Sequence, residues 1–265
     1  PCQTYALNAY NFYFALIQID ENGDFVPVFK SQTFSSSAGR TVGNYNYKFA
    51  ANSVAPGIYL LAAYNDGLDT NLMDSTVLKA KGNAVISASD YNADYNSGQS
   101  TTVKVTDKNT GKPLKFLEVK AVFNDGTESV SKYFITDSAG QFSYVPRFNV
   151  GTCTVTYSSN LAQVSAAAVK RTMVINKAQT TTTASKVSAY QGYKVTLKAT
   201  VKSQGKNVNE GKVTFKINGK TYSVAVKNGV ATKKVKLSKA KSYKYTATFN
   251  DNNFVKSVAS STATI

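Results

Sequence analysis

The sequence predicts an all-β chain made of tandem β-sandwich domains. Its 265 residues exceed the usual size of one domain and favour several domains of about 100 residues each. The composition is rich in tyrosine, threonine, valine and lysine, and only 5 residues are proline. Because β-branched and aromatic side chains fit a pleated, half-buried surface, this composition favours strands. An internal repeat supplies the third observation.

The repeat joins a short turn to alternating apolar positions that end on an aromatic residue. Its three copies are Val54–Tyr64, Asn149–Tyr157 and Lys239–Phe249. With Tyr59, Cys153 and Tyr243 taken as equivalent, the copies lie 94 and 90 residues apart. That spacing is the length of one immunoglobulin-like β-sandwich. We therefore predict three such domains: an atypical one with an N-terminal arm over 1–80, a second over 81–175, and a strongly basic third over 176–265.

In the first domain we expect a hairpin of Phe12–Ile19 and Phe25–Gln32 around an Asn-Gly turn. The acidic run Asp20–Asp24 is interpreted as this turn, because the glycine spacing and final glutamate of a calcium loop are missing. Residues 35–43 are predicted to form a loop. The remaining predicted strands are Tyr45–Ala50, Ile58–Tyr64 and Thr76–Ala80, so this domain is short by about one strand.

The second and third domains share a longer pattern of strands and turns. Thr102–Asp107 and Leu117–Gly126 in one correspond to Lys194–Val201 and Gly211–Gly219 in the other, with a Gly-Lys turn after each first strand. The alternation is clearest in the third domain, where Val195, Leu197, Ala199 and Val201 are expected to point inward. Period two with a polar outer face is typical of antiparallel sheets that have one face in water.

Three segments of the third domain resemble the tandem immunoglobulin-like domains of archaeal adhesin-like surface proteins, especially those of methanogens; related domains occur in bacterial surface proteins. The segments are Gly211–Lys220 (GKVTFKINGK), Asn228–Leu237 (NGVATKKVKL) and Phe249–Phe254 (FNDNNF). The resemblance covers roughly residues 84–265. It implies extracellular display on a cell surface and a role in adhesion, often as a stalk of repeated modules. These motifs specify turns and core strands, so no binding residue is carried over.

The chain is not expected to be an enzyme, and we expect no cofactor or metal. Histidine, the usual general base near neutral pH and the commonest metal ligand, is absent, and there are only 2 cysteines. The glycine-rich phosphate-binding motifs and the nucleophile-elbow motif are absent. No stretch approaches the roughly 18 apolar residues of a membrane span, so we predict no transmembrane segment in this chain.

Charge is concentrated in the third domain. Residues 1–80 carry a net charge of −2, residues 81–175 carry +3, and residues 176–265 carry +15 from 17 basic and 2 acidic groups. The candidate anionic-ligand face consists of Lys194, Lys198, Lys202, Lys234 and Lys236. Its partner would be an acidic wall polymer, an acidic glycan, anionic lipid or DNA. Nucleic acid is disfavoured because arginine is scarce and no stacking platform is evident. The alternative is a soluble stalk whose lysines prevent association.

The two cysteines leave two interpretations open. Cys153 stands where the sister domains have tyrosine, so it is expected to point into the core. It is either an inert buried thiol or the partner of Cys2 in a disulfide, within one chain or between chains.

The segment Tyr5–Ile19 is the most aromatic and apolar part of the chain. It either supplies core strands of the first domain or acts as a donor strand that completes the sheet of a neighbouring subunit. The candidate donor residues are Tyr5, Leu7, Phe12, Phe14 and Leu16. The predicted function is a cell-surface adhesin or stalk module that mediates attachment to other cells or surfaces. The alternative is an extracellular filament subunit that self-associates by strand donation.

Overall fold

The structure is a computed structural model that describes residues 2–6, 11–20, 22–35, 39–45, 47–50, 53–65 and 72–265, with backbone only for 2–6 and 39–45. Two compact units divide the chain. The first unit comprises Pro1–Tyr91, Ser100–Tyr144 and Cys153–Met173, and the second comprises Asn92–Gln99, Val145–Thr152 and Val174–Ile265. The described residues form strands and turns with no helix among them, which confirms the all-β prediction.

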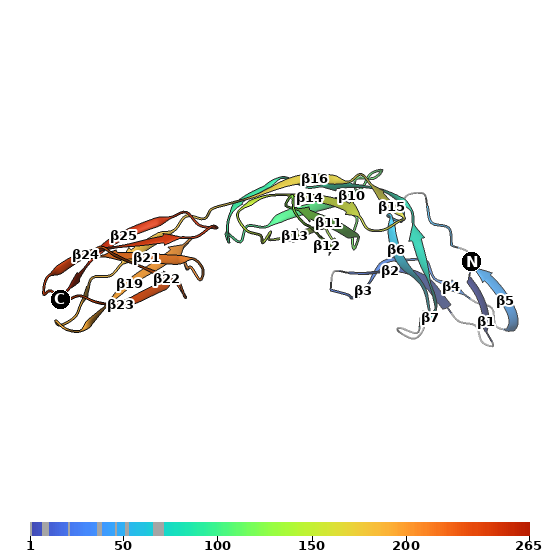
Figure 1. Cartoon of the computed structure of the whole chain (residues 1–265). Coiled ribbons are helices and arrows are strands. Elements are labelled where there is room, and N and C mark those ends of the chain that lie inside the picture. Colours follow the sequence, from blue (N-terminus) through green and yellow to red (C-terminus); the bar gives the residue numbers. More distant parts are fainter. Residues whose placement is uncertain are drawn as a thin grey trace. The chain divides into compact units, whose positions relative to one another are not determined.

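The first seven strands belong to the first unit (Figure 1). They are β1 (Cys2–Ala6), β2 (Asn11–Ile19), β3 (Phe25–Lys30), β4 (Phe34–Ser35), β5 (Gly39–Tyr45), β6 (Gly57–Asn65) and β7 (Leu72–Ala80). One sheet has the order β3-β2-β6-β7, with β4 also on β2, and β1 pairs with β5. The β2–β3 hairpin is confirmed. Its turn is closed by Asp20, whose Oδ1 accepts the N–H groups of Asn22 (2.8 Å) and Asp24 (2.9 Å).

Two predictions for this region were wrong. Residues 39–43 form part of β5 rather than a loop, and residues 47–50 are irregular rather than a strand. β5 contains Gly39 and Gly43, which interrupt the apolar alternation, and its antiparallel pairing with β1 aligns Cys2 with Tyr45. Pairing with a distant strand therefore overrides the weak local pattern.

The candidate donor strand falls within this sheet. Phe12, Phe14 and Leu16 are buried in β2, which pairs with β3, β4 and β6. Tyr5 lies in β1, for which the structure describes only the backbone, and Leu7 lies outside the described residues. These pairings agree with the interpretation of β2 as a core strand of its own domain. Filament formation by strand donation stays a prediction.

Tyr59 on β6 is expected to make the stability of this region sensitive to alkaline pH. Its hydroxyl donates to the carbonyl oxygen of Ala55 (2.7 Å), and burial raises its pKa from 10.0 to about 12. Because the folded state holds this proton more tightly, the stabilisation is present below pH 10 and is lost as pH rises toward 12. In urea titrations from pH 9 to 12, Tyr59→Phe should flatten this decline. Tyr133→Phe, at a 54% exposed position, should not.

The second sandwich comprises two sheets, with orders β13-β10-β8-β15 and β12-β11-β14-β16-β9. Its strands are β8 (Gly82–Ser87), β9 (Tyr91–Asp94), β10 (Thr101–Asp107), β11 (Glu118–Asn124), β12 (Ser129–Ile135), β13 (Gln141–Tyr144), β14 (Gly151–Ser159), β15 (Val164–Ala166) and β16 (Val169–Asn176). Cys153 is 6% exposed, which confirms its expected inward orientation. The hydroxyl of the buried Tyr157 lies 2.6 Å from that of the partly buried Tyr144, so each hydroxyl has a hydrogen-bond partner.

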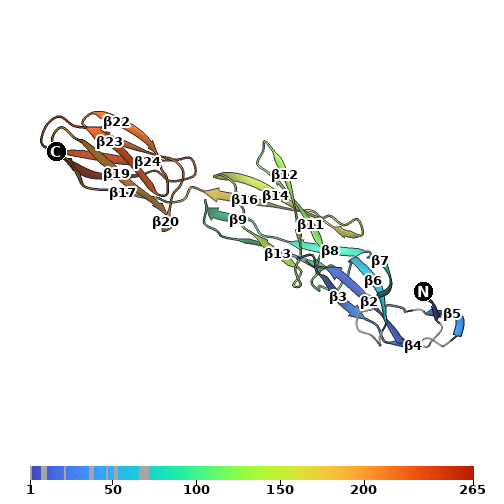
Figure 2. The same ribbon diagram turned by 90° about the horizontal axis from the view of Figure 1, so that it is seen from below.

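The third sandwich lies in the second unit and consists of two layers (Figure 2). Its strands are β17 (Thr181–Ala184), β18 (Val187–Ser188), β19 (Lys194–Ser203), β20 (Lys206–Asn207), β21 (Lys212–Ile217), β22 (Lys220–Ala225), β23 (Val230–Lys236), β24 (Ser242–Asn250) and β25 (Ser257–Thr264). One sheet has the order β17-β19-β20, with β23 also on β19, and the other has the order β18-β25-β24-β21-β22.

The core of the third sandwich follows the predicted alternation. Val195, Leu197, Ala199 and Val201 are all buried. From the opposite sheet, the hydroxyl of Tyr245 donates to the carbonyl oxygens of Ser185 and Lys198, the latter at 3.1 Å. This contact links the two layers through the core. The boundaries 1–80, 81–175 and 176–265 stay a prediction, since the division into two compact units does not test a division into three domains.

Candidate anion-binding surface

Five exposed lysines share one outer face of the third sandwich. In β19, Lys194, Lys198 and Lys202 alternate with buried apolar residues, so all three point outward. In β23, Lys234 and Lys236 are exposed in the same way. The register sets Lys194 opposite Lys236 and Lys234 opposite Thr196. The structure thus brings together all five residues of the candidate face, which we call the lysine face. Its role in binding stays a prediction.

The positive charge of the lysine face has little compensation within its own sandwich. Residues 176–265 carry 17 basic groups but only two acids, Glu210 and Asp251. Glu210 accepts a hydrogen bond from the hydroxyl of Tyr95 (3.5 Å), and Asp251 accepts the N–H of Asn253 (2.8 Å). Because like charges directly opposite across a strand pair are destabilising, the Lys194–Lys236 pair has an energetic cost.

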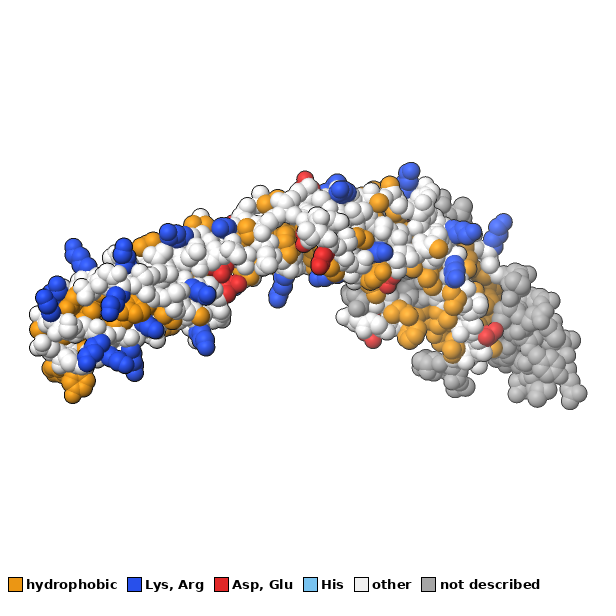
Figure 3. Space-filling model, viewed as in Figure 1, with side chains coloured by type: hydrophobic (Ala, Val, Ile, Leu, Met, Phe, Trp, Pro, Cys, Tyr) orange, Lys and Arg blue, Asp and Glu red, His pale blue; other side chains and the backbone are white. Residues whose placement is uncertain are grey.

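The outer face of the second sheet is also basic. Lys212 and Lys216 of β21 and Lys244 of β24 are exposed. Threonines lie between them, with Thr214 opposite Thr248 and Lys216 opposite Thr246. Figure 3 shows basic side chains, in blue, at many separate places on the visible surface of the sandwich that ends in the C-terminus, where every basic residue is a lysine. Both sheets of the third sandwich therefore present lysines to solvent.

Two tyrosines at one end of this sandwich are strongly exposed and were not among the residues predicted from the sequence to form a binding site. Tyr190 is 87% exposed and Tyr193 is 71% exposed. They flank a turn in which the N–H of Tyr193 donates to the carbonyl oxygen of Tyr190 (3.1 Å) and Gly192 has φ of +90°. A pair of aromatic residues around a turn glycine, outside any alternating pattern, was the available signal. We call Tyr190–Tyr193 the tyrosine turn.

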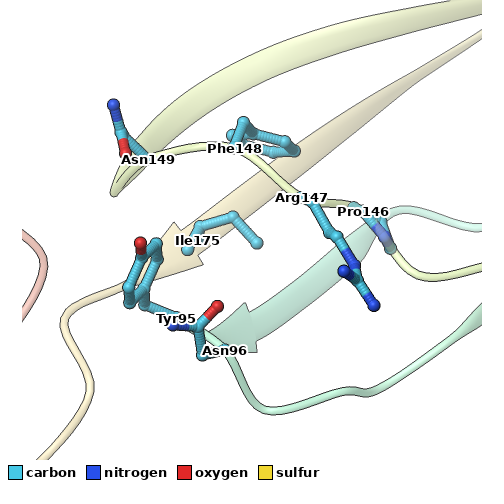
Figure 4. A pocket seen from close by; sticks show the side chains of 7 residues that line it. All are labelled: Tyr95, Asn96, Pro146, Arg147, Phe148, Asn149 and Ile175. Atoms are coloured by element: carbon cyan, nitrogen blue, oxygen red, sulfur yellow. The ribbon is translucent and has the colours of Figure 1, made fainter. Parts of the chain in front are cut away.

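A pocket of about 180 Å³ lies within the second unit (Figure 4). It is lined by Tyr95, Asn96, Pro146, Arg147, Phe148, Asn149 and Ile175. The ring of Tyr95 packs edge-on against the ring of Phe254, with 5.4 Å between centroids. The pKa of Tyr95 is raised, mainly by burial and secondly by the negative charge of the Glu210 carboxylate. Asn149 Oδ1 accepts a hydrogen bond from Asn253 Nδ2 (3.3 Å). In Figure 4 the side chains of Asn96 and Arg147 extend toward the same side of the pocket.

Other chemical features fall outside these surfaces. Over the described part of the chain, no three side chains of the His, Cys, Asp and Glu types gather where a metal ion would bind. The same residues include no helix of the length and apolarity that crossing a membrane requires. Cys153 is buried, and burial raises the pKa of its thiol. Because the side chain of Cys2 lies outside the described residues, the Cys2–Cys153 disulfide stays a prediction.

Comparisons with known proteins bear on the fold. No protein-family model matches the chain, and no curated protein matches its sequence. Among solved structures, the chain is similar to a tetra-tandem repeat in the extending region of a large adhesion protein, at 15% identity over 98% of this chain and 68% of that chain, with a TM-score of 0.37. It is also similar to invasin, a bacterial integrin-binding protein (19% identity, 69% of this chain and 39% of that chain, TM-score 0.46). A two-domain fibronectin type III segment of chicken tenascin gives 12% identity over 68% of this chain and 97% of that chain, with a TM-score of 0.35.

Proposed function

We propose that this chain is a non-catalytic module of a cell-surface adhesin or stalk, displayed outside the cell, and that its third sandwich attaches to anionic polymers. The observation that carries the proposal is the lysine face. It sets five exposed positive charges on one side of a single sheet. The role is adhesive because the feature is an extended charged surface on a repeated β-sandwich rather than an enclosed reaction site.

The geometry of the lysine face suits a polymer better than a single small anion. Side chains on one face of a strand repeat about every 7 Å, and neighbouring strands lie about 4.8 Å apart. Lysines at alternate positions of one strand, and lysines on neighbouring strands, can therefore contact successive charges of one polymer molecule. Each exposed contact contributes little, about 0.3–0.5 kcal/mol, so useful affinity requires several at once. Such binding weakens as salt screens the charges.

A purely solubilising role for the lysines explains less of the arrangement. Solubility requires only that charges of either sign are dispersed over the surface. A Glu or Asp opposite Lys194 would meet that requirement and would also stabilise the sheet through a cross-strand pair of opposite charges. Instead the register places Lys236 there. Repulsion within a strand pair is relieved when a polyanion lies across it, so the cost of this pair is consistent with a surface shaped for a negatively charged partner.

The test replaces Lys194, Lys198, Lys202, Lys234 and Lys236 with glutamine in the full chain. Loss of five contacts should weaken binding to sodium polygalacturonate by about 2 kcal/mol, or roughly thirtyfold, in ~0.1 M salt, measured by biolayer interferometry. The matched control replaces the exposed Lys81, Lys104, Lys108, Lys112 and Lys115, which removes the same charge from another domain. Equal weakening by both variants would mean that net charge alone governs binding, and the proposal would be wrong.

A further inference from the structure

We infer that the tyrosine turn is a sugar-stacking platform, and that the polymer held by the lysine face is therefore a carboxylated polysaccharide. This inference rests on the proposed function and names the substrate class of the same surface. It starts from the exposure of Tyr190 and Tyr193 at 87% and 71%. Aromatic side chains gain most of their favourable free energy by burial, so two exposed rings three residues apart indicate a surface that a ligand covers.

The tyrosine turn is held in place by its surroundings. Besides the hydrogen bond between Tyr193 and Tyr190, the N–H of Ala189 donates to the carbonyl oxygen of Thr264 (3.0 Å). The side-chain Nε2 of Gln191 donates to the carbonyl oxygen of Ser238 (3.4 Å). The turn is thus attached to the last strand and to the loop after β23. Rings on an anchored turn lose less conformational entropy when a ligand binds.

The tyrosine turn directly precedes the first strand of the lysine face in the chain. Tyr193 directly precedes Lys194, the first residue of β19, which pairs with Lys236 at the end of β23. The loop contacted by Gln191 leads on to Lys239 and Lys241, and the N–H of Ile265 donates to the carbonyl oxygen of Lys241 (3.1 Å). Rings and ammonium groups therefore gather at one end of the sandwich, next to the C-terminus.

The pyranose ring of a uronic acid presents a face of C–H groups that packs on an aromatic ring, and the carboxylate of the same sugar pairs with an ammonium group. A polymer of uronic acids repeats both features in every residue, whereas an inorganic polyphosphate has charges but no ring. Single-stranded nucleic acid also stacks on aromatic side chains. However, all 17 basic residues of 176–265 are lysine, so the arginine side chains that add cation–π contacts with bases at nucleic-acid sites are missing. The combination favours the carboxylated sugar.

The experiment compares Tyr190→Ala/Tyr193→Ala with wild type and with Tyr133→Ala, an exposed tyrosine of the second sandwich. Dissociation constants are measured for polygalacturonate, polyphosphate and single-stranded DNA of matched charge. The double variant should lose about tenfold affinity for polygalacturonate and keep its affinity for polyphosphate. Tyr133→Ala should behave like wild type.

Unchanged binding of polygalacturonate by the double variant would overturn the inference, as would an equal loss on polyphosphate. A loss on DNA as large as that on polygalacturonate would overturn it in favour of a nucleic-acid platform. The five-lysine variant separates the two proposals. If it loses affinity for both polygalacturonate and polyphosphate while the tyrosine variant loses neither, the lysine face stands and the sugar platform fails.

Discussion

Phe215→Ala is expected to destabilise the third sandwich by about 3–5 kcal/mol, because it removes a large side chain from a closed core. Phe215 on β21 is fully buried and lies 6.1 Å from the ring of Tyr245 between centroids. Its neighbours in the same core cluster come from both sheets, so the cavity cannot close by the movement of one strand.

Hydrogen exchange with mass spectrometry measures this effect domain by domain, through amide protection in peptides from residues 194–250. The matched control is Tyr222→Ala, because Tyr222 lies opposite Phe215 in the register but is only partly buried. It should cost less than half as much. Comparable losses of protection in the two variants would contradict the description of the core.

Gly140→Ala is expected to destabilise the second sandwich by about 3 kcal/mol, from strain at positive φ and from steric overlap. Gly140 has φ of +68°, and an added Cβ would lie 2.8 Å from the carbonyl oxygen of Val105 and 2.9 Å from the N atom of Leu114. Both neighbours are backbone atoms that hydrogen-bond to each other (2.9 Å), so they cannot move aside without breaking that bond.

Gly111 provides a control that separates strain from overlap. Its φ is +69°, almost the same as that of Gly140, but an added Cβ would meet nothing within 4 Å. Gly111→Ala should therefore cost only about 1 kcal/mol, from the backbone conformation alone. The free energies come from hydrogen exchange of peptides in residues 101–144. If both variants lose the same amount, the close approach at Gly140 is not real.

The sequence predicts the second and third sandwiches well because their strands have one face in water. In β19, period-two alternation alone identifies the buried residues Val195, Leu197, Ala199 and Val201. The first region is harder, because β2 buries side chains on both faces. Phe12 and Phe14 belong to one apolar cluster, whereas Ala15 and Ile17 belong to another. The near-continuous apolar run of β2 shows no alternation from which the buried face could be predicted. The position of β5 depends on its pairing with β1, which lies far away in the sequence.

In the candidate site too, features that depend on local alternation could be predicted and features that depend on distant pairing could not. The lysine face could be predicted because the orientation of a strand residue is a local property, fixed by alternation. The pairing of Lys194 with Lys236 could not, because it depends on register between strands far apart in sequence. The tyrosine turn has no period, and the pocket around Arg147 joins three separate segments of the second unit. The pair of tyrosines around Gly192 is a weak sequence signal whose exposure is known only from the fold, and the pocket has no sequence signal at all.

We propose that the third sandwich recognises a polymer whose carboxylates and sugar rings are both contacted. The most direct measurement is the affinity of the full chain for polygalacturonate before and after methyl esterification of the carboxyl groups, which removes the charge and keeps the rings. Esterification should lower the affinity about thirtyfold or more at ~0.1 M salt, because it removes as many ionic contacts as the five-lysine variant does. Equal affinity for the charged and esterified polymers would contradict it.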